Sequence, residues 1–294
     1  MEVLIQLLVN GIIAGGTYAV VALGYGLVYG TLKFPNFAHG TVAMVGAYAV
    51  YWLARDPFHL PFGLAVFLAV VLTAGVGILI EFIAYRHWRG VSWLAPLVTT
   101  IAIALVLQAV VMLLTGSRPM TYGFPVVRGL EIGPVLITPV QIIMVVGSVT
   151  LMISIYAVLT LTKLGKAMRA VADDVPLAEL CGIDSNYIID WVFAIGSACA
   201  AVAGILFGLD TTLTHNMGTS MTIKSFAAVI LGGLGSIQGA VIGGYLLGIG
   251  ENLGVWFLPA VWKDSIAFAI MTIGLYIKPT GFYGQAEDKM VLGK

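Results

Sequence analysis

Long apolar stretches dominate this sequence of 294 residues and restrict what it can fold into. A helix needs about 20 apolar residues to cross the roughly 30 Å hydrocarbon core of a bilayer. Barrel strands would instead alternate apolar and polar residues, which the apolar run at 151–161 does not do. We therefore predict an all-α, polytopic membrane protein. The stretches that approach or exceed the spanning length lie at about 3–30, 37–54, 61–84, 94–115, 138–162, 188–209, 226–250 and 264–278.

The composition supports the same fold class. Only 10% of the residues are charged and 60% are hydrophobic, whereas average soluble domains have about 25% and 45–50%. So little polar surface cannot cover a water-soluble globule, which excludes a cytosolic enzyme, a nucleic-acid-binding protein and a disordered chain. The 14 basic and 14 acidic side chains balance, so charge gives no reason to expect an acidic partner. Residues 1–294 are expected to form a single transmembrane domain in contact with membrane lipid.

Two of the apolar regions contain glycine, proline and polar residues that interrupt them. One break includes residues 34–39 and the other includes residues 232–238. The segments that follow are alike, with AHGTV from Ala38 and IQGAV from Ile237. Paired interrupted helices are typical of transporters built from repeats, although glycine is also common wherever membrane helices pack closely. The sequence predicts eight to ten transmembrane helices, two of them interrupted, and an internal repeat.

The distribution of basic residues gives an expected orientation. If all eight stretches are simple crossings, lysine and arginine are shared equally between the two sides. Splitting the first and seventh stretches at their breaks makes ten crossings and concentrates the basic residues on the side of Lys163. The positive-inside rule then places the Lys163 loop and both chain ends in the cytoplasm. Half-helices could equally re-enter on the same side, which leaves the number of crossings open.

The loop at 163–187 carries the most information about function. Asp173 or Asp174 can cap a short helix whose first turn accepts Pro176. Gly182 suits the left-handed residue that ends such a helix. The spacing therefore predicts about two helical turns within this loop.

The same short helix has an apolar face formed by Leu177, Leu180 and Cys181. A helix of two turns is not stable alone in water. Its apolar face therefore needs a partner surface, which is either the membrane domain of the same chain or another protein.

Four motifs, in this order along nearly the whole chain, resemble the bacterial branched-chain amino acid ABC transporter permease family, in particular its LivH-type subunit. Each motif alone would be a weak signal, whereas the four together are specific. The loop motif resembles the coupling loop of ABC importer permeases, whose short helix docks into a groove of the ATPase subunit. The motifs are YGTLKFPNFAHGTVAMVGAY, LGKAMRAVADDVPLAELCGI, FAAVILGGLGSIQGAVIGG and IKPTGFYG.

The resemblance implies which residues of the loop couple the chain to an ATPase. Glu179 and Cys181 lie inside the motif at positions where the family shows no clear preference, so neither is expected to be an essential contact. Lys166 and Arg169 could pair with acidic residues at the rim of the groove. The expected coupling residues are Gly165, Lys166, Arg169, Ala170, Leu177, Ala178, Leu180, Gly182 and Ile183.

The resemblance also implies a set of partners in the bacterial inner membrane. A second, homologous permease subunit would complete the pathway as a heterodimer, above two ABC ATPase subunits. A periplasmic solute-binding protein would deliver a small amino-acid substrate. The chain has no GxxxxGK[ST] phosphate loop. ATP and Mg are therefore expected on the ATPase subunits, and this chain is expected to be a transporter subunit, not an enzyme, without a cofactor or metal of its own.

The two breaks are also where a substrate could cross. An amino-acid carboxylate needs oriented donors at membrane depth, which the N-terminus of a half-helix supplies. Polar residues at the breaks could alternatively satisfy the backbone groups that the breaks release. Those in the fourth stretch could form hydrogen bonds between helices. The candidate pathway residues are Asn36, His39, Thr99, Thr100, Gln108, Gly233, Gly235, Ser236 and Gln238.

The acidic residues near the ends of the stretches help to separate the functional alternatives. Glu81 is expected to pair locally with Arg86, and Glu251 and Asn252 are expected to be within reach of water. Because no acid cluster is evident at the centre of a stretch, a secondary transporter driven by an ion gradient is disfavoured. The same ABC machinery could instead carry urea, short amides or another small polar solute.

Overall fold

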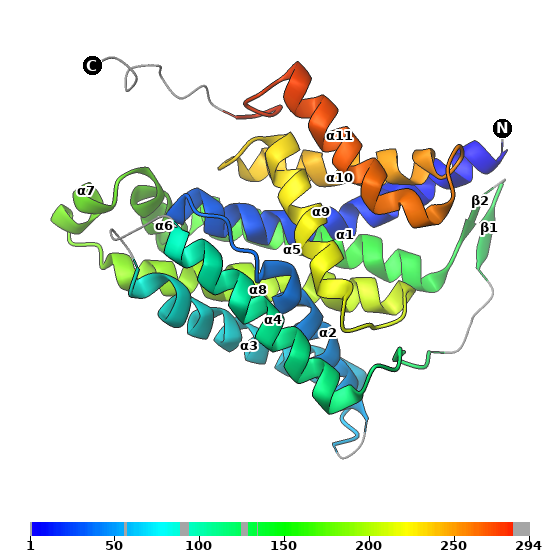
Figure 1. Cartoon of the computed structure of the whole chain (residues 1–294), viewed down its shortest axis with the longest axis horizontal. Coiled ribbons are helices and arrows are strands. Elements are labelled where there is room, and N and C mark those ends of the chain that lie inside the picture. The colour runs from blue at the N-terminus through cyan, green and yellow to red at the C-terminus, as the bar shows by residue number, and fades with distance from the viewer. Residues whose placement is uncertain (1, 56–57, 89–93, 125–128, 134, 285–294) are drawn as a thin grey trace.

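The structure, a computed structural model, describes residues 2–55, 58–88, 94–124, 129–133 and 135–284. Within these residues the chain is almost entirely helical (Figure 1). The one sheet in this part of the chain is a short antiparallel pair, β1 (Leu130–Ile132) and β2 (Val135–Ile137). The all-α fold class is therefore confirmed.

The longer helices coincide with the eight apolar stretches, and the seventh stretch forms two helices. Two short helices, α6 (Lys163–Asp173) and α7 (Val175–Leu180), follow α5, and a 3-10 turn, η2 (Ala260–Trp262), precedes α11. A π-helical turn, η1 (Glu81–Arg86), continues α3. The longer helices are α1 (Glu2–Leu32), α2 (His39–Ala54), α3 (Phe62–Ile80), α4 (Leu94–Thr115), α5 (Pro139–Leu161), α8 (Ser185–Asp210), α9 (Met217–Gly232), α10 (Ile237–Gly254) and α11 (Lys263–Ile277).

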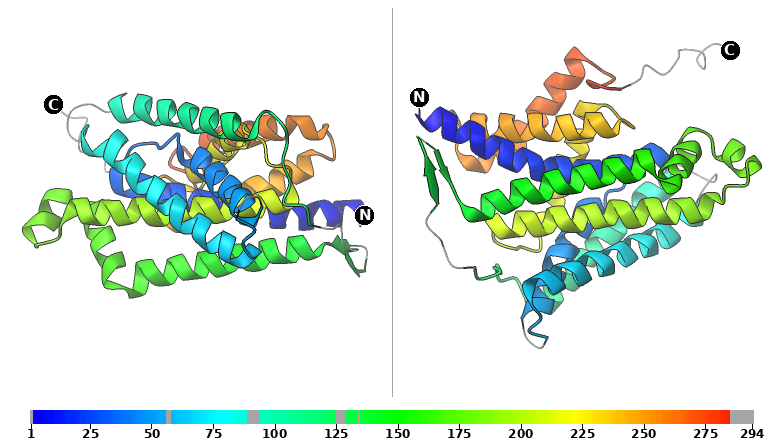
Figure 2. Two further views of the ribbon diagram at one scale, coloured as in Figure 1. Left: turned by 90° about the horizontal axis from the view of Figure 1, so that it is seen from below. Right: turned by 180° about the vertical axis from the view of Figure 1, so that it is seen from behind.

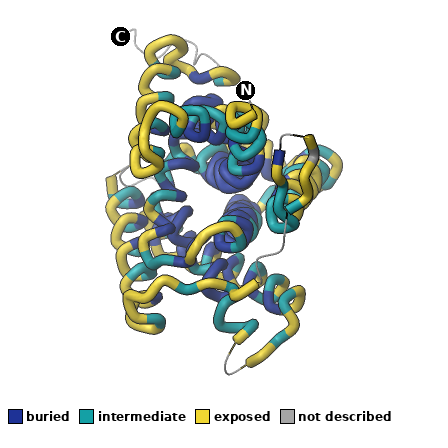
Figure 3. The backbone as a smooth tube through the Cα atoms, turned by 90° about the vertical axis from the view of Figure 1, so that its right-hand side faces the viewer, coloured by how far each residue is buried: buried dark blue, intermediate teal, exposed yellow. Residues whose placement is uncertain are grey.

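Six of the described helices are long and apolar enough to cross a membrane, or seven if the bent pair α9 and α10 counts as one span. This number is smaller than the eight to ten predicted, because α2 and α9 have only 16 residues each. α1 and α8 are mostly buried, whereas few residues of α4, α5 and α11 are buried. Figure 3 shows the buried residues concentrated in the middle of the bundle. The outer helices thus present the apolar surface that lipid would cover.

The two central helices α1 and α10 pack through glycines spaced four residues apart. A Cβ atom added at Gly15 would lie 2.9 Å from the Cα atom of Tyr245, and one added at Gly248 would lie 2.4 Å from the Cα atom of Gly15. Side chains at these positions would force the two backbones apart, as expected for small residues at a membrane helix interface.

The first interruption lies between two helices and does not divide one. α1 continues through its glycines to Leu32, and residues 33–38 then separate it from α2. The expectation that the first stretch itself splits was therefore wrong. The glycines of α1 are contact points instead, since a Cβ atom at Gly24 would lie 2.6 Å from the carbonyl oxygen of Gly196 in α8. The second interruption is a sharp bend of 118° between α9 and α10.

The continuous α1 changes the orientation expected for the N-terminal end. Gln6 exchanges two hydrogen bonds with the backbone of Leu136, next to the start of α5. The Lys163 loop follows the other end of α5, so these two parts of the chain lie at opposite ends of the bundle (Figures 1 and 2). The prediction that both lie on the same side was wrong. The final residues 285–294 lie outside the described part of the chain.

The segments that looked like a repeat share one contact in the structure. A Cβ atom at Gly40 would lie 2.2 Å from the backbone nitrogen of Thr222, and one at Gly239 would lie 2.3 Å from the carbonyl oxygen of Gly232. Thr222 and Gly232 both belong to α9. The glycine in each motif therefore allows the first turn of α2 or α10 to pack against α9, and the internal repeat stays a prediction.

Candidate coupling loop and translocation pathway

The coupling loop begins with a tight corner between α5 and α6. The Thr162 hydroxyl caps α6 by accepting a hydrogen bond from the backbone nitrogen of Gly165, at 3.0 Å. A Cβ atom at Gly165 would lie 2.3 Å from the carbonyl oxygen of Leu159, so glycine is needed at this corner. Arg169 donates a hydrogen bond to the same Leu159 oxygen, which the end of α5 leaves without a helical partner. Arg169 thus ties α6 to α5.

The short helix α7 begins and ends as its sequence predicts. Asp174 is the cap, and its carboxylate accepts a hydrogen bond from the backbone nitrogen of Leu177 at 2.9 Å. Pro176 lies in the first turn. Gly182 has a φ of +80°, and the next amide, that of Ile183, donates to the carbonyl oxygen of Ala178. These local interactions hold a helix that is too short to be stable by itself.

The apolar side chains of α7 divide between the protein and open space. Ala178 is buried, and Ile183 is half-buried against the core. Leu177 is 59% exposed and Leu180 is 85% exposed. α7 extends from the end of the bundle beyond α6, as Figures 1 and 2 show. The exposed leucines are therefore accessible to another protein.

The remaining residues predicted to couple the chain lie along α6. Lys166 is exposed, and Ala170 is half-buried with its side chain packed against the core. Glu179, a residue not expected to be essential, accepts a hydrogen bond from the hydroxyl of Ser185 in α8. The sequence contains no local signal for this bond, because it depends on the turn between α7 and α8.

At the first break, the predicted pathway residues support the backbone. The side-chain oxygen of Asn36 accepts a hydrogen bond from the backbone nitrogen of Ala38 at 3.1 Å. The ring of His39 is buried, and its Nε2 atom lies 3.2 Å from the carbonyl oxygen of Val21 in α1. The Asn36 contact agrees with the alternative in which polar residues satisfy the groups that an interrupted helix releases. His39 instead links the first turn of α2 to the middle of α1.

At the second break, the chain is held by the segment that follows α11. The backbone nitrogens of Phe282 and Tyr283 donate to the carbonyl oxygens of Leu231 and Gly232, at 2.9 and 2.7 Å. Gly233 has a φ of +112°, and a Cβ atom there would lie 2.2 Å from the nitrogen of Gly284. The motif IKPTGFYG therefore satisfies the exposed carbonyl groups at the end of α9.

The residues after Gly233 start the second half of the interrupted region. Gly235 has a φ of +84°, a conformation that favours glycine. The Ser236 hydroxyl caps α10 by accepting a hydrogen bond from the backbone nitrogen of Gly239 at 3.0 Å. These two residues are therefore explained by the turn and the helix start.

Gln238 is the predicted pathway residue that faces an open groove. The groove has a volume of about 440 Å³ and lies between α1, α5 and α10. Its other side chains are mainly aliphatic, together with two tyrosines. The lining residues are Leu23, Met152, Ile153, Tyr156, Ile237, Gln238, Val241, Ile242 and Tyr283.

The polar residues of the fourth stretch form hydrogen bonds within and between helices. Thr99 and Thr100 donate to carbonyl oxygens of their own helix, those of Ala95 and Leu97. Gln108 donates to the Thr219 hydroxyl of α9 at 2.8 Å. The expected use of Gln108 between helices is confirmed, whereas the two threonines bond within α4.

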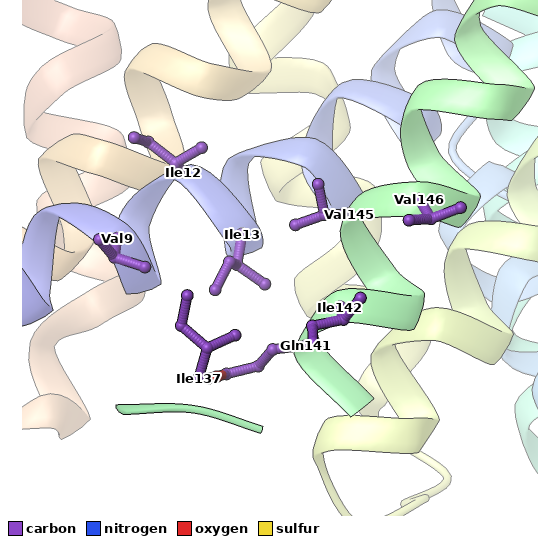
Figure 4. Close-up of a pocket in the computed structure, with 8 residues that line it drawn as sticks. All are labelled: Val9, Ile12, Ile13, Ile137, Gln141, Ile142, Val145 and Val146. Carbon is purple, nitrogen blue, oxygen red and sulfur yellow. The ribbon is translucent and has the colours of Figure 1, made fainter. Parts of the chain in front are cut away.

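A second cavity lies near the other end of α1, where Figure 4 shows apolar side chains of α1, β2 and α5 around it. Its volume is about 250 Å³. Gln141 is the polar residue in its lining, and its side-chain oxygen already accepts a hydrogen bond from the backbone nitrogen of Thr138 at the start of α5. The other lining side chains are aliphatic.

Sequence reasoning missed a buried ionic network between α1, α9, α10 and α11. The Nζ atom of Lys224 lies 3.0 Å from Glu251 Oε2 and 3.3 Å from Asp264 Oδ1. The Tyr18 hydroxyl donates to the same Glu251 oxygen at 2.9 Å. Glu251 is fully buried, and Asn252 is also buried, so the expectation that water reaches them was wrong. A lysine and a glutamate within two successive apolar helices were the signal that could have indicated the pair.

The expected local pair of Glu81 is confirmed. Its Oε2 atom lies 3.2 Å from Nη2 of Arg86, and the same arginine nitrogen lies 2.6 Å from Oδ1 of Asp190 in α8. Among the described residues, no three histidine, cysteine, aspartate or glutamate side chains lie close enough together to hold a metal ion.

Comparison with known proteins identifies similar chains over nearly the full length. Residues 7–275 match the family described as branched-chain amino acid transport system, permease component. The high-affinity branched-chain amino acid transport system permease protein BraD of Pseudomonas aeruginosa is 36% identical and aligns over 98% of each chain. LivH of Escherichia coli strain K12, which has the same description, is 35% identical over 98% of this chain and 97% of its own. A probable LivH of Methanocaldococcus jannaschii is 30% identical over 97% and 94%.

Proposed function

We propose that this chain, which belongs to the family of permease components of branched-chain amino acid transport systems, forms part of the membrane pathway of an ATP-driven importer of branched-chain amino acids. It is a multi-pass protein of the bacterial inner membrane. The pathway is completed by a second, homologous permease subunit, and two ATPase subunits drive the cycle. A periplasmic solute-binding protein supplies the amino acid.

The observation that carries this proposal is the exposed apolar face of α7. Leu177 and Leu180 project from a six-residue helix held in place by its caps. Exposed leucines at the tip of a cytoplasmic loop need a protein surface to cover them. Basic residues gather at the same end of the bundle, and Lys163, Lys166 and Arg169 precede α7 directly. The positive-inside rule assigns such an end to the cytoplasm, where ATPase subunits are available.

The groove beside Gln238 supports the nature of the substrate. Aliphatic side chains from α5 and α10 line it, and they suit a branched hydrocarbon tail. The free amide of Gln238 lies in the first turn of α10, where helical N–H groups and the helix dipole favour a carboxylate. This groove opens toward the outside of the chain, so a second permease subunit placed against α5 and α10 would enclose the pathway.

The division of labour follows from the sequence of this chain. It has no GxxxxGK[ST] loop for ATP phosphates. ATP and Mg are therefore bound by the partner ATPases, whose closure displaces α7 and the helices joined to it. This chain contributes the membrane pathway and the docking helix, and the partner ATPases hydrolyse ATP.

Docking through α7 is tested by changing the shape of this helix while leaving the membrane domain intact. Replacing Gly182 with valine places a β-branched residue at a φ of +80°, which such residues do not tolerate. We expect the ATPase subunits to be lost when the Gly182→Val complex is purified in detergent. Gly182→Asn is the matched control, because asparagine accepts this conformation. ATPase retention by the valine variant equal to that of the asparagine variant would contradict the proposal.

A further inference from the structure

We propose that Arg86 is a positioning residue that transmits movement of α7 to residues 33–38, the break that precedes α2. This inference rests on the proposed function, because ATPase subunits must move α7. Its side chain joins η1 to α8 at the same end of the bundle as the coupling loop. A continuous series of contacts leads from α7 through α8 and η1 to residues 33–38.

The first contact fixes α7 to the start of α8. Glu179 accepts a hydrogen bond from the Ser185 hydroxyl, and Ser185 is the first residue of α8. The intervening turn is short and closed, because the amide of Ile183 donates to the carbonyl oxygen of Ala178. Asp184 caps α8. A displacement of α7 must therefore move the first turns of α8.

The second contact joins α8 to η1 through Arg86. Asp190 lies in the second turn of α8, and its Oδ1 atom is 2.6 Å from Nη2 of Arg86. The same nitrogen is 3.2 Å from the carboxylate of Glu81, which is fully buried. An isolated surface ion pair contributes little. Arg86 differs because it connects a buried acid on one helix with a half-exposed acid on another, so its geometry is fixed.

The third contact joins η1 to the first break. The ring of Tyr85 packs against Phe193 of α8, with centroids 5.0 Å apart. Its hydroxyl donates to the carbonyl oxygen of Pro35 at 3.3 Å. Pro35 directly precedes Asn36, which stabilises the turn into α2. One residue of η1 therefore contacts both α8 and the break at residues 33–38.

The π-helical geometry of η1 allows the backbone at Glu81–Arg86 to change conformation. π-turns occur as short irregularities within α-helices and are frequent at functional sites. Farther along the same two helices, contact is close, since a Cβ atom at Gly77 would lie 2.0 Å from the Ser197 hydroxyl. α8 can therefore move at its first turns while α3 stays packed farther along. Arg86 makes η1 follow α8, and Tyr85 carries that shift to Pro35.

The proposal predicts that loss of Arg86 separates ATP hydrolysis from transport. The test uses the complete importer in proteoliposomes and measures the amount of labelled leucine taken up per ATP hydrolysed. Arg86→Gln should lower this ratio several-fold while hydrolysis continues. Arg86→Lys, which keeps a cation between Glu81 and Asp190, should retain most of the wild-type ratio. Arg118→Gln is the matched control and should leave the ratio unchanged, because this exposed arginine follows the C-terminal end of α4, whereas Arg86 precedes the start of that helix.

A second variant keeps the proposal testable if Arg86→Gln does not accumulate. Asp190→Asn removes the half-exposed partner, leaves Glu81 paired with Arg86, and should lower the same ratio. A wild-type ratio in both Arg86→Gln and Asp190→Asn would overturn the role of Arg86, as would a ratio in Arg86→Lys no higher than that in Arg86→Gln. Absence of ATP-dependent uptake by the unmodified complex would instead overturn the proposed function.

Discussion

Lys224 and Glu251 form an ion pair inside the helical bundle, with the Nζ atom 3.0 Å from Oε2. The two residues come from α9 and α10, on either side of the 118° bend. The Tyr18 hydroxyl of α1 bonds to both of them. The pair therefore joins three helices where charges would be costly without partners.

Removing one charge of this pair should destabilise the protein. Lys224→Met leaves the buried Glu251 carboxylate without its cation, which typically costs about 3–5 kcal/mol. We expect a lower midpoint of thermal unfolding in detergent, measured by the loss of helical circular dichroism. The double variant Lys224→Met with Glu251→Leu should recover much of this loss, because no charge is left buried. A double variant as unstable as the single one would show that the lysine acts in another way.

Close packing between α2 and α9 should make Gly40 sensitive to one methyl group. A Cβ atom there would lie 2.2 Å from the Thr222 nitrogen and 2.4 Å from the carbonyl oxygen of Gly218. Because both are backbone atoms, Gly40→Ala must separate the helices, at a cost of about 1–3 kcal/mol or more. Gly75→Ala, where nothing lies within 4 Å, should be neutral or slightly stabilising. Equal unfolding midpoints for the two variants would contradict the close contact.

The segment after α11 should detach from α9 when Gly281 is replaced. Gly281 has a φ of +75°, and a Cβ atom would lie 2.5 Å from the nitrogen of Gly233. In Gly281→Ala we expect faster hydrogen exchange of the Phe282 and Tyr283 amides, which bond to the end of α9. Gly116→Ala is the matched control, since its φ is +70° with nothing within 4 Å. Unchanged exchange in the Gly281 variant would show that the segment is held elsewhere.

Placing a charge on the exposed face of α7 should weaken ATPase binding without weakening the fold. Leu180 is 85% exposed, so Leu180→Glu removes no packing within the chain. The charge would enter an apolar interface, and we expect loss of the ATPase subunits by size-exclusion chromatography with an unchanged unfolding midpoint. The same change at Leu130, exposed in β1 at the opposite end, should retain them. Similar elution of both variants would argue against docking through this leucine.

Local signals in the sequence predicted the features that depend on local structure. The apolar stretches matched the helices, and Asp174, Pro176 and Gly182 defined α7 because caps and left-handed residues act over a few positions. The roles of Asn36 and Ser236 at the breaks could also be anticipated as support for the backbone.

Tertiary contacts between distant segments could not be predicted from the sequence. Glycines in α1 suggested a break, whereas they allow α8 and α10 to approach. Glu251 looked accessible because its position near the end of α10 does not reveal Lys224 beside it. The contact between Tyr85 and Pro35 joins residues 50 positions apart, and no periodicity in the chain indicates it.

The most direct test of the account is uptake of labelled leucine into proteoliposomes that contain this chain, its second permease subunit, both ATPases and the binding protein. We predict uptake that requires ATP and every subunit and that is lost in Leu180→Glu. Uptake by this chain alone, driven by a proton or sodium gradient and unaffected by Leu180→Glu, would contradict an ATP-driven permease coupled through α7.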